Sequence, residues 1–282
     1  MLLTLIWGTT WAAIRVGLAG LPPFKGVALR FAIASVLLLA LAWWRGIPLG
    51  RKPYERLLWV VNGVLFFSVS FGVVYWAEQS VPSGLTSVLF SLFPLLVALL
   101  AHVALPAERL RARAGVGALI GFLGVAVIFS EDFRKLGGEH VLFGCGVLLL
   151  SPTVSAISSV AIKRFGSEIH PISLAAVPMA VCAAVMAVLA LVFEAGRPIT
   201  WSAATVGSLL YLAIAGSCVT FTLYYWLLRH VRASRVALIA YATPVIAVAT
   251  GVIFLHEPLT SRFVLGGALV IAGVAFTAKS RY

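Results

Sequence analysis

Few residues in this chain have the chemistry needed for catalysis. Among nine acids there is one aspartate, Asp132, and the three cysteines, Cys145, Cys182 and Cys218, lie singly in apolar runs. Catalysis would require paired carboxylates, a metal cluster or an activated nucleophile, and the chain has neither an HExxH motif nor a phosphate-binding glycine loop. We therefore expect no catalytic residue, no metal site and no cofactor, and we interpret the cysteines as small buried residues.

The remaining polar and aromatic side chains could bind a small molecule by hydrogen bonding and stacking. Trp7, Thr10 and Trp11 lie within about one helical turn of each other, and Ser87 and Ser91 are four residues apart on one helical face. Hydroxyls on one face also suit close helix packing, and tryptophans also anchor membrane interfaces. Both interpretations stay open for these residues.

The composition indicates which elements position these side chains. The 282 residues are 62% hydrophobic and 11% charged, whereas a soluble domain has about 45–50% apolar and 25% charged residues. Too few polar side chains remain to cover a water-facing surface, so we expect an all-α membrane protein. The net charge of +12 lies in short clusters between apolar runs, which argues against a nucleic-acid partner.

A membrane-spanning helix needs about 20 apolar residues. Prolines, glycines and charge clusters divide the chain into ten such segments: 2–18, 27–44, 57–77, 82–105, 114–130, 141–162, 171–193, 203–228, 236–255 and 262–278. The first segment has no basic stretch before it and no small-residue cleavage site after it. We therefore interpret it as a span rather than a signal peptide.

The basic residues indicate how the helices are oriented. Of the 21 lysines and arginines, fourteen fall in one set of alternating loops and five in the other, with Arg15 and Arg30 inside helices. Cytoplasmic loops carry the excess of positive charge, so we expect both termini in the cytoplasm. Arg15 ends the first helix, where it could extend to the membrane surface or receive a substrate carboxylate.

The chain contains an internal repeat. At an offset of about 150 residues, rare residue types recur in register: Tyr75 with Tyr225, Pro94 with Pro244 and Glu108 with Glu257. Residues 1–138 and 139–282 then form two halves of five helices each. Because five is odd, the second half enters the membrane from the opposite side, an arrangement typical of secondary transporters.

The paired residues of the repeat suggest different roles. We expect Pro94 and Pro244 to mark flexible or kinked points beside a central site, since neighbouring groups in a membrane protein can satisfy the backbone that a proline leaves free. We expect Glu108 and Glu257 near opposite membrane surfaces, as caps or as partners of basic residues. Glu78 breaks the repeat, because position 228 is leucine, and we predict that it is a gate or cation contact.

Several stretches resemble the EamA branch of the drug/metabolite transporter superfamily. They are WGTTWAAIR (7–15), LRF (29–31), TSVLFSLFPLLVALLAHVALPAE (86–108), GALIGFLGV (117–125), ALIAYATPVIAVATGVIFLHEPLT (237–260) and GGALVIAGV (266–274). The resemblance covers essentially the whole chain, and it is specific for the fold but weak for the substrate. It implies ten transmembrane helices in two inverted five-helix repeats, and export of amino acids or other small metabolites by alternating access.

The resemblance also implies which helices face the central cavity: the first, third, fourth, sixth, eighth and ninth. The substrate-binding residues predicted on these helices are Trp7, Thr10, Trp11, Tyr75, Ser87, Ser91, Ser155, Tyr225 and Tyr241. Arg30 fits the family pattern at the start of the second helix, and we predict that it anchors this helix at the interface. The superfamily's small four-helix multidrug members use a glutamate in the first helix, and this chain has no carboxylate there.

We therefore predict a bacterial inner-membrane secondary transporter that exports small metabolites, foremost amino acids, with a slight preference for apolar or aromatic ones. The alternatives are an exporter of other small solutes or drugs, and a channel-like facilitator, although no ring of charges or filter motif is visible. The expected partners are the small-molecule substrate and the lipid bilayer. We expect a monomer or a homodimer.

Overall fold

The computed structural model describes residues 2–50, 52–105, 112–130, 139–166, 168–236 and 239–279, with the backbone alone for residues 112–114, 118, 139, 234, 240–242, 274 and 277–279. Within these ranges the regular secondary structure is helical and no strand is present. This confirms the predicted all-α class.

The first half of the chain follows the predicted segments, with two interruptions. The segment predicted over 57–77 contains a widened π-helical stretch, and the segment predicted over 82–105 breaks at Ser91 and Leu92. The elements are α1 (Leu2–Leu18), α2 (Pro23–Trp44), α3 (Pro53–Asn62), η1 (Gly63–Ser70), α4 (Phe71–Ala77), α5 (Ser83–Phe90), α6 (Phe93–Ala104) and α7 (Ala112–Phe129).

The second half is divided in a similar way. Its eighth predicted segment, 203–228, also contains a π-helical stretch. The elements are α8 (Glu139–Leu148), α9 (Leu150–Phe165), α10 (Pro171–Phe193), α11 (Ala203–Ala213), η3 (Ile214–Val219), α12 (Thr220–His230), α13 (Ala233–Val236), α14 (Ile239–Leu255) and α15 (Ser261–Lys279).

Among the described residues, six helical stretches are long and apolar enough to span a membrane: Pro23–Trp44, Pro53–Ala77, Ser83–Ala104, His140–Phe165, Pro171–Phe193 and Ala203–His230. Shorter apolar helices lie at Leu2–Leu18, Gly115–Phe129, Thr243–Leu255 and Ser261–Gly273. These stretches overlap the ten predicted segments. That all ten cross the membrane stays a prediction.

Prolines define where several helices begin. Pro23, Pro53 and Pro171 are the first residues of α2, α3 and α10, a position where proline lacks only an N–H that would have no helical partner. The second helix therefore begins four residues earlier than predicted. This shift moves Arg30 from the predicted helix start to the helix interior.

The two π-helical stretches widen the helices near the middle of the bundle. In η1 the hydroxyl of Ser68 donates to the carbonyl of Gly63 at 2.8 Å. In η3 the hydroxyl of Ser217 donates to the carbonyl of Leu212 at 2.8 Å. Each serine bonds five residues back, which matches the wider turn, and such local widenings occur frequently at functional sites.

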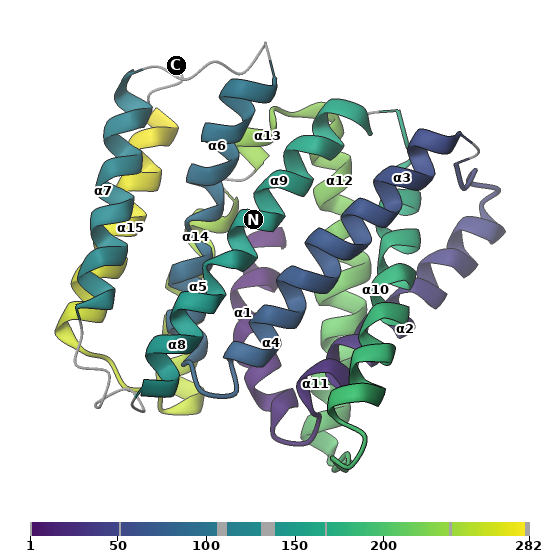
Figure 1. The fold of residues 1–282 in the computed structure, drawn as a ribbon, viewed down its shortest axis with the longest axis horizontal. Helices are drawn as coiled ribbons and strands as arrows, with labels where there is room; N and C mark the ends of the chain where they lie inside the picture. The colour runs from purple at the N-terminus through teal and green to yellow at the C-terminus, as the bar shows by residue number, and fades with distance from the viewer. Residues whose placement is uncertain are drawn as a thin grey trace.

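The helices pack in pairs that cross between the two halves. Figure 1 shows α7 beside α15 at one edge of the bundle, and α2 packs against α10. Between these pairs, α1 packs against α14 and α11, and α9 packs against α6 and η1. The core is therefore built from helices far apart in the sequence.

The two predicted hinge prolines have different surroundings. Pro94 lies in the first turn of α6, directly after the break at Ser91 and Leu92. Pro244 lies inside α14, which continues through it as one helix. The chain thus departs from a continuous helix beside the first proline and not beside the second, and movement at either proline stays a prediction.

The contact between α7 and α15 depends on glycine, and this generates a testable prediction. A Cβ added at Gly124 would lie 2.6 Å from the carbonyl oxygen of Gly266 and 2.6 Å from the backbone nitrogen of Val270. We expect Gly124→Ala to destabilise the protein by about 1–3 kcal/mol, as overpacking does. Thermal unfolding in detergent measures this effect.

Gly146→Ala is the matched control, because a Cβ at this helical position meets nothing within 4 Å. We expect its melting temperature to equal or slightly exceed that of the wild type, since alanine favours a helix by roughly 0.5–1 kcal/mol over glycine. Equal melting temperatures for the two variants would show that the α7–α15 contact does not need the glycine.

Candidate functional site

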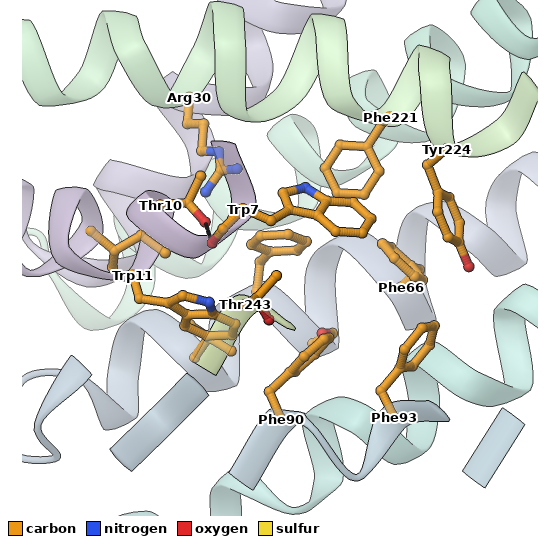
Figure 2. A pocket seen from close by; sticks show the side chains of 14 residues that line it. Trp7, Thr10, Trp11, Arg30, Phe66, Phe90, Phe93, Phe221, Tyr224 and Thr243 are labelled. Carbon is orange, nitrogen blue, oxygen red and sulfur yellow. Dashed lines mark hydrogen bonds between the residues drawn. The ribbon is translucent and has the colours of Figure 1, made fainter. Parts of the chain in front are cut away.

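An internal cavity lies between helices from both halves of the chain. Its volume is about 60 Å³, and one water needs roughly 10–15 Å³ on this measure, so the cavity has room for a few waters. The side chains that line it are shown in Figure 2: Trp7, Thr10, Trp11, Ile14, Arg30, Phe66, Ser70, Phe71, Val74, Phe90, Phe93, Phe221, Tyr224 and Thr243.

Helix α1 supplies three of the predicted site residues, Trp7, Thr10 and Trp11. Their spacing of three and four residues places them on one helical face. Thr10 Oγ1 donates to the carbonyl of Trp7 at 2.7 Å, so this hydroxyl retains lone pairs that can accept. The indole nitrogen of Trp11 is buried and has no hydrogen-bond partner in the part of the chain that the structure describes. The cavity wall therefore contains an unused N–H donor.

Another part of the wall is aromatic. The ring of Trp7 packs against Phe221 and Tyr224, with centroid separations of 5.7 and 5.5 Å. Phe90 and Phe93 flank the break between α5 and α6, and their rings stack 5.6 Å apart. Several rings thus line the cavity where an apolar or aromatic group could pack.

Arg30 does not anchor the membrane interface, and that prediction is wrong. Because α2 begins at Pro23, Arg30 lies two turns inside the helix and is 1% exposed. Its Nε donates to Ser217 Oγ at 2.9 Å, its Nη2 to the carbonyl of Gly216 at 2.9 Å and its Nη1 to the hydroxyl of Tyr75 at 3.3 Å. The guanidinium is therefore held between α2, α4 and η3, beside the cavity.

Two further features hold the Arg30 guanidinium in place. Its carbon lies 4.9 Å from the ring centroid of Phe71, a favourable arrangement of a cation over a ring face. A Cβ at Gly216 would lie 3.4 Å from Arg30 Nη2 and 3.0 Å from Thr10 Cγ2. The glycine thus lets α1, α2 and η3 meet closely, with Thr10 and Arg30 as neighbours.

Two other predicted residues lie next to the cavity rather than in its wall. Tyr75 is buried, and its hydroxyl accepts the bond from Arg30 described above. Ser155 donates to the hydroxyl of Ser70 at 2.9 Å, and Ser70 lines the cavity. Both predicted residues therefore support groups that face the cavity.

Ser87, Ser91 and Tyr225 are not among the described residues that line the cavity. Ser87 is buried, and its hydroxyl has no partner. Ser91 donates to a carbonyl of its own helix at 2.6 Å. Tyr225 accepts a hydrogen bond from Asn62 at 2.8 Å. The backbone of Tyr241 lies in α14, but its side chain is outside the described part. Their roles in binding stay predictions.

Tyr225 instead belongs to a buried polar network between α3, α9 and α12. Asn62 donates to its hydroxyl, and Ser158 donates to the amide oxygen of Asn62 at 2.8 Å. Next to it, the hydroxyl of Tyr224 donates to Ser159 at 2.9 Å. Because Tyr224 also lines the cavity, this network connects the aromatic wall to α9.

Sequence reasoning missed the phenylalanines of the wall: Phe66, Phe71, Phe90, Phe93 and Phe221. A phenylalanine that faces lipid and one that faces a cavity look alike in an apolar sequence. The available signal is local: Phe66 and Phe71 lie in or directly after η1, near Ser68 and Ser70. Polar residues close to rings in a membrane segment could have indicated an internal face.

Glu78 directly follows α4 and is 0% exposed. Both of its carboxylate oxygens are buried and have no hydrogen-bond partner among the described residues, whereas Arg15 donates to its backbone carbonyl. Glu257 is satisfied instead: it accepts from the backbone nitrogens of Ser83 at 2.7 Å and Gly84 at 3.0 Å, at the start of α5. Its predicted capping role is therefore seen on a neighbouring helix. Glu108 lies outside the described residues.

The arrangement suits binding. In the described part of the chain, no group of three or more His, Cys, Asp or Glu side chains could hold a metal ion. In Figure 2, Arg30, Thr10 and Trp11 lie toward one end of the cavity, and Phe66, Phe93 and Tyr224 lie toward the other. The site can therefore hold a small molecule that has a polar end and an apolar end.

The sequence model of the EamA-like transporter family matches residues 1–130 and 142–279 of the chain. The chain is 28% identical to the uncharacterized transporter YoaV of Bacillus subtilis, over 96% of this chain and 92% of that protein. It is 30% identical to the uncharacterized inner membrane transporter YedA of Escherichia coli, over 99% of this chain and 89% of that protein.

A solved crystal structure shares this fold. Its TM-score is 0.74 at 22% sequence identity, and the match covers 99% of this chain and 95% of that chain. The helical arrangement described above is therefore one that a known protein adopts along nearly its whole length.

The buried network around Tyr225 predicts a measurable effect on stability. We expect Tyr225→Phe to destabilise the protein by about 1–3 kcal/mol, because the amide of Asn62 loses its 2.8 Å acceptor and keeps only a 3.4 Å contact to the carbonyl of Leu174. Tyr54→Phe, at a tyrosine that is 41% exposed, is the matched control. Thermal unfolding in detergent should separate the two variants, and equal shifts would contradict the role of the network.

Proposed function

The chain belongs to the EamA-like transporter family, and we propose that it is a secondary transporter that exports small metabolites, foremost amino acids with apolar or aromatic side chains, by alternating access. Its family and its relatives indicate a membrane transporter rather than an enzyme. The observation that carries the proposal is the aromatic-walled cavity between helices of both halves.

The size of the cavity supports alternating access. A space of about 60 Å³ is small beside the roughly 300–1,000 Å³ of typical ligand pockets, so we propose that the helices around it move when substrate binds. The break at Ser91 and Leu92 lies between two cavity rings, Phe90 and Phe93. We propose that α5 and α6 move at this break, with Pro94 as one hinge and Pro244 as the other.

We further infer that residues 1–138 and 139–282 are two inverted five-helix repeats with ten membrane-spanning helices in total. Three observations support this. The family model matches one range in each half. The contacts are reciprocal, because α2 packs on α10 and α7 on α15, while α1 packs on α14 and α9 on α6. The π-helical stretches η1 and η3 lie in corresponding segments of the halves.

We propose the bacterial inner membrane as the location, with both termini in the cytoplasm and the chain acting as a monomer or homodimer. The loop charges support the orientation, and YedA, one of the relatives, is named as an inner membrane transporter. We also propose that Trp7, Thr10 and Trp11 contact the substrate, with the other predicted residues supporting them.

Glu78 is proposed as the gate residue at its end of the bundle. A buried carboxylate without partners is costly when it is ionised. The arrangement described here, with Glu78 buried, is called closed, and it favours the neutral acid. Opening would hydrate the carboxyl and release its proton. Glu78 would then stabilise the closed arrangement only while it is protonated.

The titratable and charged groups that act on Glu78 come from several elements: Tyr75 on α4, Arg15 on α1, Arg30 on α2 and Glu257 after α14. Arg197 donates to the side chain of the adjacent Gln79 at 3.3 Å. Burial raises the pKa of the Glu78 carboxyl well above its ordinary value, the negative charge of Glu257 raises it further, and Arg15 and Arg30 oppose the rise.

Transport assays test the proposed function. The purified protein is reconstituted in liposomes, and counterflow of labelled phenylalanine and leucine is measured against protein-free liposomes. We expect saturable exchange. Conductance without saturable exchange would support a channel-like facilitator instead, and exchange of cationic drugs without exchange of amino acids would support the drug-export alternative.

The pH dependence of stability tests the state of Glu78. Because the folded protein binds this proton more tightly than the unfolded chain does, stability falls as pH rises from the ordinary carboxyl pKa toward the raised one. We expect Glu78→Gln, which cannot titrate, to lose this dependence. Its melting temperature between about pH 5 and pH 8 should vary less than that of the wild type.

The control for this experiment is Glu168→Gln, because Glu168 is exposed. Its melting temperature should follow the wild-type dependence on pH. Parallel curves for the wild type and Glu78→Gln would show that Glu78 is not protonated in the closed arrangement.

A further inference from the structure

Arg30 is a positive charge inside the bundle without a negative partner. It is 1% exposed and lines the cavity, and within the described part of the chain it makes no ion pair. An arginine at the centre of a membrane-spanning helix is costly and rare. Because Arg30 lies next to the cavity rather than at the membrane surface, an anionic ligand in the cavity could pair with it.

The guanidinium also has unused donors. It carries five N–H groups, and three of them donate to Ser217, Gly216 and Tyr75. All three acceptors are formally neutral, so the positive charge itself is not compensated. One N–H on each terminal nitrogen remains for a ligand. Two such donors suit a carboxylate, which a guanidinium binds through parallel hydrogen bonds.

The neighbouring groups complete a small polar end to the cavity. The indole N–H of Trp11 is buried without a partner, and Thr10 lies beside Arg30 at Gly216. Figure 2 places these three side chains toward one end, away from Phe66 and Tyr224. A carboxylate would meet donors at this end, while an attached apolar group would meet rings at the other.

Glu78 does not supply the partner of Arg30. Arg30 lowers its pKa, so the two groups influence each other through space. Both carboxylate oxygens of Glu78 nevertheless lack any hydrogen-bond partner, so Glu78 does not occupy the free donors of Arg30. The charge of Arg30 is left for a molecule in the cavity.

We propose that Arg30 binds the carboxylate of the substrate, and that the transported class is therefore small carboxylates with an apolar or aromatic group. The inference rests on the proposed transport function and narrows its substrate class. It assigns Arg30 as a specificity-determining residue that accepts acids, including amino acids, and rejects amines of the same shape. Cationic drugs are excluded by the same charge.

Three probes of matched shape test this inference: phenylalanine, 3-phenylpropionate, which lacks the ammonium group, and phenethylamine, which lacks the carboxylate. Binding to the detergent-solubilised protein is followed by the fluorescence of its tryptophans, since Trp7 and Trp11 line the cavity. We expect phenylalanine and 3-phenylpropionate to bind and phenethylamine to bind at least about tenfold more weakly, as expected for the loss of charge-assisted hydrogen bonds.

The variants separate recognition from stability. Arg30→Gln should weaken binding of the two carboxylates at least about tenfold and abolish the preference over phenethylamine, and Arg30→Lys should retain part of that preference. Arg164→Gln, at an exposed arginine, should behave as the wild type. A merely structural role for Arg30 would change the binding of all three probes equally.

Each outcome bears on one of the two proposals. Binding of phenethylamine as tight as that of 3-phenylpropionate, or unchanged carboxylate binding in Arg30→Gln, overturns the carboxylate site, as does the absence of carboxylate binding. If the wild type binds carboxylates through Arg30 but shows no counterflow, the site stands and the transport proposal fails. If Arg30→Gln does not fold, the affinities of the wild type for the three probes still show whether the site prefers carboxylates to amines.

Discussion

The burial of one guanidinium constrains the centre of this structure. A charged group inside a lipid-facing bundle must find acceptors from the protein, because neither lipid nor bulk water supplies them. Arg30 finds them on two other elements, at Tyr75 on α4 and at Gly216 and Ser217 on η3. Helix α2, the widened turn of η3 and the glycine at position 216 therefore depend on one another. Among the residues of this network, Arg30 lines the cavity.

The acids follow the same constraint with different results. Glu194 accepts from the backbone nitrogens of Phe24 and Lys25 at 2.9 Å each, and Glu257 does the same at the start of α5. Both carboxylates use N–H groups that a helix start leaves without partners, and the helix dipole favours their charge. These two acids hold helix ends together. Glu78 has no such partner among the described residues, and its burial favours the protonated form.

The sequence predicts elements better than internal faces. Apolar runs locate the helices, and the segment predicted over 171–193 coincides with Pro171–Phe193, because a chain in lipid must satisfy its backbone within helices. The family resemblance implies that the first helix faces the cavity, and Trp7 and Trp11 line the cavity in the structure, while their contact with a substrate stays a prediction. The predicted position of Arg30 is wrong because the predicted segment begins at residue 27, after Pro23. Proline fits the first turn of a helix, so α2 begins at Pro23 and Arg30 lies deeper inside the helix. The phenylalanines line the cavity because helices of the two halves pack together. An apolar run in the sequence does not indicate which of its side chains will face another helix.

The distribution of tight contacts also limits how the cavity can open. At Gly124 and Gly266 the backbones of α7 and α15 are so close that an added Cβ would clash, and the Arg30 network connects α2, α4 and η3. Close-packed interfaces of this kind resist gradual deformation. The break between α5 and α6 contrasts with them, because its helical bonding is interrupted and Phe90 and Phe93 border the cavity there. The proposed movement of these rings at the break would enlarge the cavity and leave the hydrogen bonds of Arg30 intact, because Arg30 bonds to neither α5 nor α6.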